Sequence, residues 1–254
     1  MAKVYAALET GTTGLWYGRL TEHLGTHARA ATRDQALVEL EEELRYHQEW
    51  LRRHGETPPR VESPEITVAE EVTGVSQLGE SGGEVALFRY DFKAVSPSLL
   101  EECVKRMGYN RSDLLAQVRG LSAESMSVMP PGKKRNITQI LSHVCNAEEF
   151  YASRLGPEAD RVYESSLGMR MEEADRLSVF QRLEAVRRGC VETLRQVAPG
   201  KEDRVFTRAE YTSYPGERWT AHKVLRRFLE HEREHIYNIR EYLGLRPRGP
   251  VLKP

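Results

Sequence analysis

The sequence is poor in cysteine, in net charge and in long apolar runs, and each of these absences argues against a class of protein. Its three cysteines are widely spaced and form no CxxC pair, so we expect a reducing cytoplasm rather than a disulfide framework. With 37 basic and 38 acidic residues, the net charge of −1 argues against general attraction to nucleic acid or to an anionic membrane. No apolar run approaches the roughly 18 residues that span a bilayer, and the N-terminus lacks the blocks of a signal peptide.

The first third of the chain predicts an α+β domain over residues 1–80. Its β-prone runs are short and separated by turn residues, and they cover residues 3–9, 15–20, 26–31 and 65–72. Between the third and fourth runs, a capping box at Thr32 opens an amphipathic helix that extends to about Arg53. We therefore expect a short antiparallel sheet plus one helix.

The rest of the chain predicts an all-α four-helix bundle over residues 97–246. Residues 81–96 are assigned to a linker or extended arm, and residues 247–254 to a tail. The amphipathic segments that follow the linker have apolar residues three or four apart, and they cover residues 97–121, 136–155, 176–198 and 220–243. Four such helices in about 150 residues are typical of a bundle.

The last helical segment contains His231-Glu232-Arg233-Glu234-His235, the H-E-x-x-H pattern of many metalloproteases. Its two histidines are four residues apart, so they share one helix face and can meet one divalent ion. The extended protease motif needs Gly and His where this chain has Asn238 and Glu241, and little chain follows to supply another ligand. A protease is therefore not expected, and the open alternatives are a bundle metal site or two ordinary core-edge histidines.

The third ligand is predicted upstream, at His143 in the second helical segment. Together with His231 and His235, it can converge in a bundle core and give a His₃ site with open positions, the arrangement that suits catalysis. Such a site accepts zinc, nickel, iron or manganese. The alternative for His143 is again a core-edge histidine.

The residues near these histidines carry weaker expectations. Cys145 is expected to pack in the core, and Glu232 and Glu234 to be solvated, unless Glu232 orients a histidine. Three aromatic side chains can either line a pocket or simply pack: Tyr151, Tyr237 and Trp219.

Three stretches resemble the DinB-like (YfiT-like) four-helix bundle family over roughly residues 97–246: "RSDLLAQVRGLS", "NITQILSHVCNAEEFYASRL" and "WTAHKVLRRFLEHEREHIYNIREYLG". In that family, a histidine on the second helix and an H-x-x-x-H pair on the last form a divalent-metal triad, and the matching positions are His143, His231 and His235. The resemblance implies homodimers and a metal-dependent enzyme that acts on a small-molecule substrate. It favours transfer of a low-molecular-weight thiol over hydrolysis, and it assigns no catalytic residue.

The N-terminal region, residues 1–80, is similar to HicB-like antitoxin folds, which implies a protein partner for that domain. No DNA-binding segment follows it here, so a structural, oligomerising or ligand-sensing role is equally expected. Two alternatives to an enzyme therefore stay open. One is a non-catalytic ligand- or stress-sensing module with a protein-interaction domain, and the other is a bundle in which the metal is only a structural staple.

Overall fold

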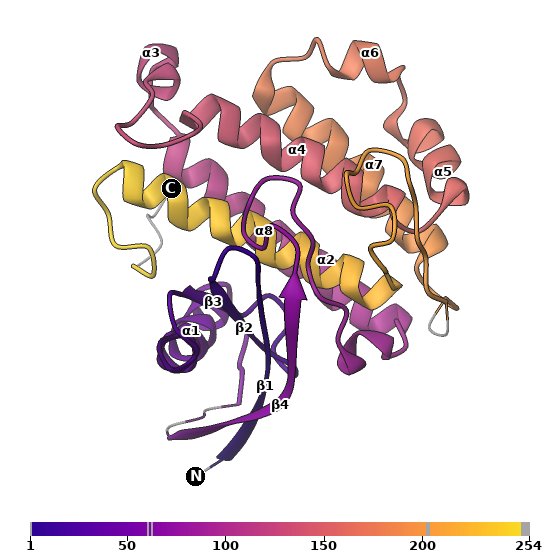
Figure 1. Cartoon of the computed structure of the whole chain (residues 1–254). Coiled ribbons are helices and arrows are strands. Elements are labelled where there is room, and N and C mark those ends of the chain that lie inside the picture. Colours follow the sequence, from indigo (N-terminus) through magenta and orange to yellow (C-terminus); the bar gives the residue numbers. More distant parts are fainter. Residues whose placement is uncertain (1, 60, 62, 202–203, 250–254) are drawn as a thin grey trace. The chain divides into compact units, whose positions relative to one another are not determined.

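The computed structural model describes residues 2–59, 61, 63–201 and 204–249, and the chain divides into two compact units (Figure 1). The first unit consists of Met1–Lys93 and Thr207–Arg218, and the second of Ala94–Phe206 and Trp219–Pro254. Across the described ranges, no helix is long and apolar enough to cross a membrane.

The first unit contains a four-stranded sheet in the order β3-β2-β1-β4. Its strands are β1 (Ala2–Gly11), β2 (Trp16–Leu20), β3 (His27–Ala30) and β4 (Pro64–Val75). β1 pairs antiparallel with β2, and β2 with β3, but β1 pairs parallel with β4. The predicted α+β class is confirmed, and the expected antiparallel sheet is corrected to a mixed one. The reason is the helix between β3 and β4, because a helical crossover returns the chain in the direction it had before.

That crossover helix, α1 (Arg33–Arg53), begins at the predicted cap, where the Thr32 hydroxyl accepts a hydrogen bond from the Gln35 N–H at 3.3 Å. Its apolar face and the sheet form one core, whose buried members are Val4, Ala6, Leu8, Leu20, Ala28, Leu40 and Leu44. A short 3₁₀ turn, η1 (Arg89–Phe92), lies near the end of the unit's first segment.

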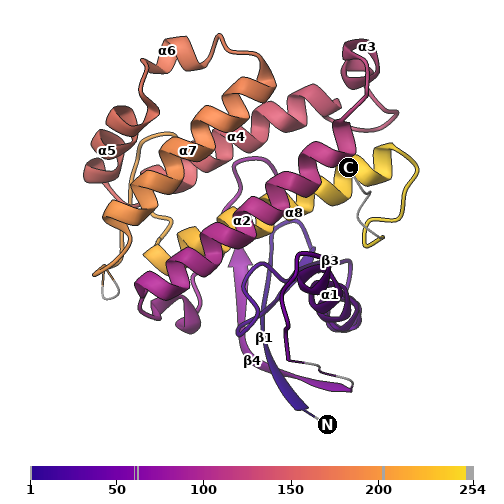
Figure 2. The ribbon, with the colours of Figure 1, turned by 180° about the vertical axis from the view of Figure 1, so that it is seen from behind.

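The second unit is helical, as predicted, and its four long helices form a bundle (Figure 2). They are α2 (Pro97–Val118), α4 (Ile137–Ser153), α7 (Val179–Val197) and α8 (Ala221–Tyr242). α8 packs against α2 and α4, and α7 packs against α4. Three shorter helices lie in the connections: α3 (Ala123–Ser127), α5 (Pro157–Leu167) and α6 (Met171–Ala174).

Each long helix of the bundle begins at a polar side chain that accepts a hydrogen bond from a backbone N–H three residues on. These caps are Ser96, Asn136, Ser178 and Thr220. Just before α8, Phe206 and Trp219 exchange two backbone hydrogen bonds of 2.8 and 2.9 Å. The caps and this bridge fix where each helix starts, and so which residues face the interior.

Candidate metal centre

The three histidines predicted as ligands lie together between α4 and α8. Nε2 of His231 is 3.1 Å from Nε2 of His143 and 3.1 Å from Nε2 of His235. One nitrogen of each ring lies within 4.8 Å of the other two. The sequence positions 143 and 231 are 88 residues apart, so the bundle fold is what brings the third histidine to the pair.

The two helices present these rings in different ways. His231 and His235 are one turn apart on α8, and each side chain is only 7% exposed. His143, in the middle of α4, is half-buried. Of the three rings, His143 is therefore the most open to solvent.

The environment keeps all three rings uncharged at neutral pH. Burial, followed by the charge of His235, lowers the pKa of His143 to about 3. Burial likewise lowers the pKa of His235 to about 4, and it lowers the pKa of His231 well below its usual range. A neutral imidazole keeps one nitrogen lone pair, so the cluster offers three uncharged nitrogen donors directed at one another.

This donor set fits a divalent ion. Bonds of about 2.0–2.1 Å place neighbouring ligand nitrogens about 3.0 Å apart at octahedral corners and about 3.4 Å apart at tetrahedral corners. The two Nε2–Nε2 distances of 3.1 Å lie between these values. Imidazole donors suit zinc, iron or nickel better than magnesium or calcium, and three protein ligands leave open positions.

Asn238, one turn after His235, contacts the ring nitrogen of His235 that points away from the other histidines. Its side-chain amide lies 3.3 Å from His235 Nδ1. In a metal-bound form, the amide would present its oxygen to an Nδ1–H, which leaves the Nε2 lone pair free for the ion. The sequence-based prediction did not assign Asn238 to the site. Its spacing of three residues from His235 on the same helix could have indicated this contact.

An aromatic wall lines the centre on the N-terminal side of His231. The ring centroid of Tyr151, from α4, lies 5.6 Å from that of His231, and those of Trp219 and Phe228 lie 5.8 and 5.9 Å from Tyr151. Of the aromatic residues left open by the sequence, Tyr151 and Trp219 therefore belong to this wall, whereas Tyr237 is half-buried on α8.

The expectation that Glu232 is solvated is wrong, because its side chain is 1% exposed. Its two carboxylate oxygens accept hydrogen bonds from Arg111 at 2.6 Å and from Arg187 at 2.7 Å. Both arginines also bind Glu148. Burial alone would raise the pKa of Glu232, but the two guanidinium groups hold it below its usual value. Glu234, in contrast, is half-buried.

Cys145 packs in the core, as expected, and is fully buried. Burial and the nearby Glu148 carboxylate raise the pKa of its thiol to about 12. It is therefore neither a thiolate ligand nor a nucleophile at neutral pH.

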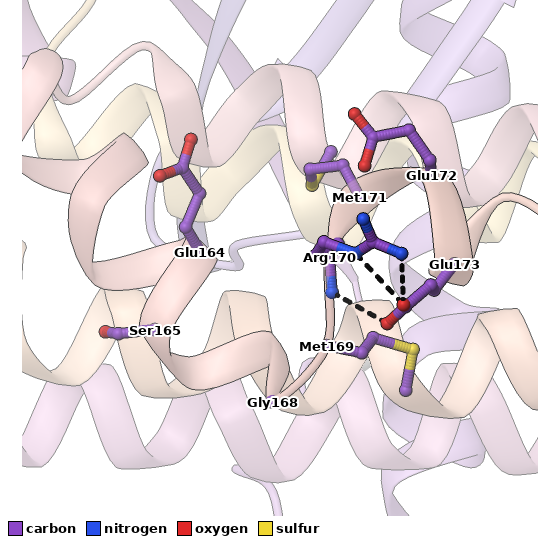
Figure 3. A pocket seen from close by; sticks show the side chains of 8 residues that line it. All are labelled: Glu164, Ser165, Gly168, Met169, Arg170, Met171, Glu172 and Glu173. Carbon is purple, nitrogen blue, oxygen red and sulfur yellow. Dashed lines mark hydrogen bonds and ion pairs between the residues drawn. The ribbon is translucent and has the colours of Figure 1, made fainter.

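A separate hollow of about 590 Å³ occurs around the α5–α6 connection (Figure 3). It is lined by residues 164–165 and 168–173, and none of the predicted site residues is among them. Its wall holds an ion pair of 2.7 Å between Arg170 and Glu173, with both side chains exposed. Its lining residues include no histidine or cysteine, and the Ser165 hydroxyl donates to the Val162 backbone oxygen, so the histidine cluster is the stronger candidate for a functional site.

The fold and this site define a class: a helical bundle that carries a trihistidine cluster between two of its long helices. The sequence model of the DinB superfamily matches residues 107–239, more than half of the chain and all three histidines, so the protein belongs to that superfamily. DinB proteins are metal-binding. No curated protein and no solved structure matches the chain significantly. The match does not reach residues 1–80, where the HicB-like resemblance stays a prediction.

Proposed function

We propose that the protein is a metal-dependent enzyme in which His143, His231 and His235 hold a divalent ion, and that it transfers a low-molecular-weight thiol to an electrophilic small molecule. The observation that carries this proposal is the pair of 3.1 Å distances among three uncharged imidazole nitrogens. His231 Nε2 carries either one proton or one lone pair, so hydrogen bonding alone does not explain why it lies 3.1 Å from the Nε2 atoms of both His143 and His235.

The residues around the cluster have distinct roles in this proposal. A divalent ion, when bound, supplies Lewis-acid chemistry that lowers the pKa of a thiol or a water molecule in an open position. Asn238 holds the His235 ring in the orientation that directs Nε2 inward. Tyr151 and its aromatic neighbours exclude water from one side of the cluster.

The state of the chain's own cysteines supports a thiol supplied from outside. Cys103, Cys145 and Cys190 are all buried, and burial raises the pKa of each thiol above its usual value. None of them can therefore act as the nucleophile in a thiol-transfer reaction at neutral pH.

Elemental analysis of purified variants tests the triad. His143→Ala and His231→Ala are expected to lose the divalent metal, whereas His222→Ala, on the same helix as His231 but outside the cluster, is expected to keep it. Full metal occupancy in the two ligand variants would sink the proposal.

The reaction type needs a separate assay with the metal-loaded protein. Bacillithiol, mycothiol and glutathione would each be offered with a model electrophile, and an ester would be offered without thiol. Metal-dependent consumption of one thiol supports S-transfer. Turnover of the ester alone would support the alternative, a metal-dependent hydrolase.

We propose a second role, protein binding, for the N-terminal unit, which follows the HicB-like resemblance. The supporting observation is β4, a strand of 12 residues at the edge of the sheet. An edge strand presents unpaired backbone groups that a partner strand can join. A pull-down with the full chain, compared with a variant carrying proline at the exposed Glu71 in β4, tests this role. Equal recovery of the same partner by both proteins would argue against the strand as its binding site.

A further inference from the structure

A buried arginine lies one helical turn before His231 on the face of α8 that carries the histidines. Arg227 is 8% exposed. One of its terminal nitrogens, Nη1, donates to Glu230 at 2.9 Å, and the other, Nη2, donates to the Tyr151 hydroxyl at 3.1 Å. Its guanidinium carbon is 5.4 Å from the centroid of the Tyr151 ring. The same ring contacts His231, so Tyr151 connects the arginine to the metal centre.

One edge of this guanidinium is incompletely used. Nε of Arg227 is buried and has no hydrogen-bond partner among the described residues. Nε and Nη2 form the edge of arginine that grips a carboxylate with two parallel hydrogen bonds. Because a buried donor without a partner costs free energy, an acceptor at this edge would be favoured.

A second orphaned donor lies beside the same tyrosine. Nε1 of Trp219 is buried and also has no hydrogen-bond partner in the described part of the chain. The Trp219 side chain is 2% exposed, and its ring centroid is 5.8 Å from that of Tyr151. The two side chains that carry these buried donors therefore both lie beside the Tyr151 ring, which also lies beside the ligand candidate His231.

The existing anionic partner of Arg227 is shared. Glu230 also pairs with Arg226 at 3.4 Å, so one carboxylate serves two neighbouring guanidinium groups. Each of these guanidinium groups therefore has only a share of the Glu230 carboxylate.

We infer that Arg227, Tyr151 and Trp219 form a subsite for the carboxylate of a small organic acid whose other end meets the metal centre. The inference rests on the proposed metal site and deepens it by naming a substrate class. Residues 227 and 231 are about 6 Å apart along the helix axis. Because the two residues are one helical turn apart, the proposed ligand is short, and we take its carboxylate to lie two or three carbons from the atom that reaches the metal. Arg227 acts here as a specificity-determining residue and has no role in bond making.

Spectroscopic titration of the cobalt-loaded protein tests this subsite without measuring activity. Mercaptopropionate and mercaptopropanol have the same carbon chain and differ in the carboxylate, and thiol binding to cobalt gives a charge-transfer absorption. Wild-type protein is expected to bind the acid about ten- to a hundredfold more tightly, the range for a charge-assisted hydrogen bond. Arg227→Gln should bind the two thiols equally, and Arg227→Lys should keep part of the preference.

A matched control removes the same charge elsewhere. Arg195 on α7 forms a half-exposed ion pair with Glu101 on α2, and Arg195→Gln should leave the preference for mercaptopropionate unchanged. Circular dichroism and metal content would verify that Arg227→Gln is folded and loaded. Equal affinities of the wild-type protein for the two thiols would overturn the subsite while leaving the metal triad standing.

A measurement on the metal-free protein separates the carboxylate subsite from the proposed metal triad. Propionate, which has no thiol, is expected to shift the indole N–H resonance of Trp219 in NMR spectra, and propanol is not. The resonance would be assigned with Trp219→Phe. If the protein takes up no metal but propionate shifts this resonance, the triad fails and the carboxylate subsite stands. No shift with propionate in a folded protein would count against the subsite.

Discussion

At the scale of single residues, the metal centre depends on which nitrogen of each histidine carries its proton. The Nε2 atoms face one another, so the protons must reside on Nδ1 if the lone pairs are to meet an ion. For His235, the partner on the Nδ1 side is the Asn238 amide. This contact makes Asn238 a residue that acts on the metal through another side chain.

Replacing Asn238 therefore tests the tautomer argument directly. Asn238→Leu should weaken zinc affinity by about 10–100-fold, the usual effect of losing such a partner. Competition with a chromogenic chelator would measure it. Asn238→Asp supplies a carboxylate that accepts from Nδ1–H, and it should retain affinity or increase it. Unchanged affinity in the leucine variant would show that the amide does not orient the ring.

The three cysteines give a second prediction at this scale. Each is buried, and burial raises the pKa of Cys103 to about 12. Because the thiolate is the reactive form, an alkylating reagent at neutral pH should modify none of them in the folded protein. All three should react after unfolding in denaturant, as counted by mass spectrometry. Stoichiometric labelling of the native protein would contradict the assigned burial.

At the scale of elements, a buried ion network joins all four long helices of the bundle. Arg111 from α2 and Arg187 from α7 each bind both Glu148 of α4 and Glu232 of α8. The two arginines also donate to the backbone oxygens of Leu183 and Met107. Glu232 directly follows the ligand candidate His231 in the sequence. The network therefore fixes the register of α8 against the other three helices. It thereby also fixes the position of His231 and His235 along the bundle axis.

Removing one charge from this network should be costly. In Glu232→Gln, two buried guanidinium groups would share one carboxylate, and breaking a buried pair in this way costs about 3–5 kcal/mol. Thermal denaturation followed by helix circular dichroism would measure the loss. Glu101→Gln, which breaks the exposed pair with Arg195, is the matched control and should change the melting temperature little. Equal effects of the two substitutions would show that the network adds no stability.

The same network marks the limit of what the sequence could predict. The i,i+4 spacing of His231 and His235 is a local property of one helix, so their shared face was predictable. Glu232 lies off that face, and its partners are 45 to 121 residues away on other helices. No periodicity within α8 distinguishes such a buried carboxylate from a solvated one. Arg227 was missed for a similar reason. A charged residue in the sequence of α8 is expected at the solvent-exposed surface, and its buried partner Tyr151 lies on another helix.

The strands of the N-terminal unit also show that local signals are predictable from the sequence, whereas long-range pairing is not. The β-prone runs and the Thr32 cap were local signals, and the strands and helix form close to where they predicted. The parallel pairing of β1 with β4 is a long-range choice. It depends on the length and direction of the crossover through α1, which alternation within a strand does not encode.

At the scale of the whole molecule, the division into two units determines what a bound metal can stabilise. All three histidines belong to the helical unit, which contains Ala94–Phe206 and Trp219–Pro254. A ligand that binds only the folded state stabilises that state by mass action. Calorimetry of the full chain should therefore show two kinds of unfolding: one that responds to metal and one that does not.

The expected size of this response makes it a decisive measurement. At a metal concentration of 100 times Kd, the helical unit should gain about 2.7 kcal/mol, and its melting temperature should rise. The transition of the sheet-containing unit should stay where it is. His235→Ala removes one of the three nitrogen donors, so its helical transition should respond little to the metal. If metal moves both transitions equally in wild-type and variant protein, the ion binds elsewhere or binds without specificity, because the histidine cluster alone cannot produce that pattern.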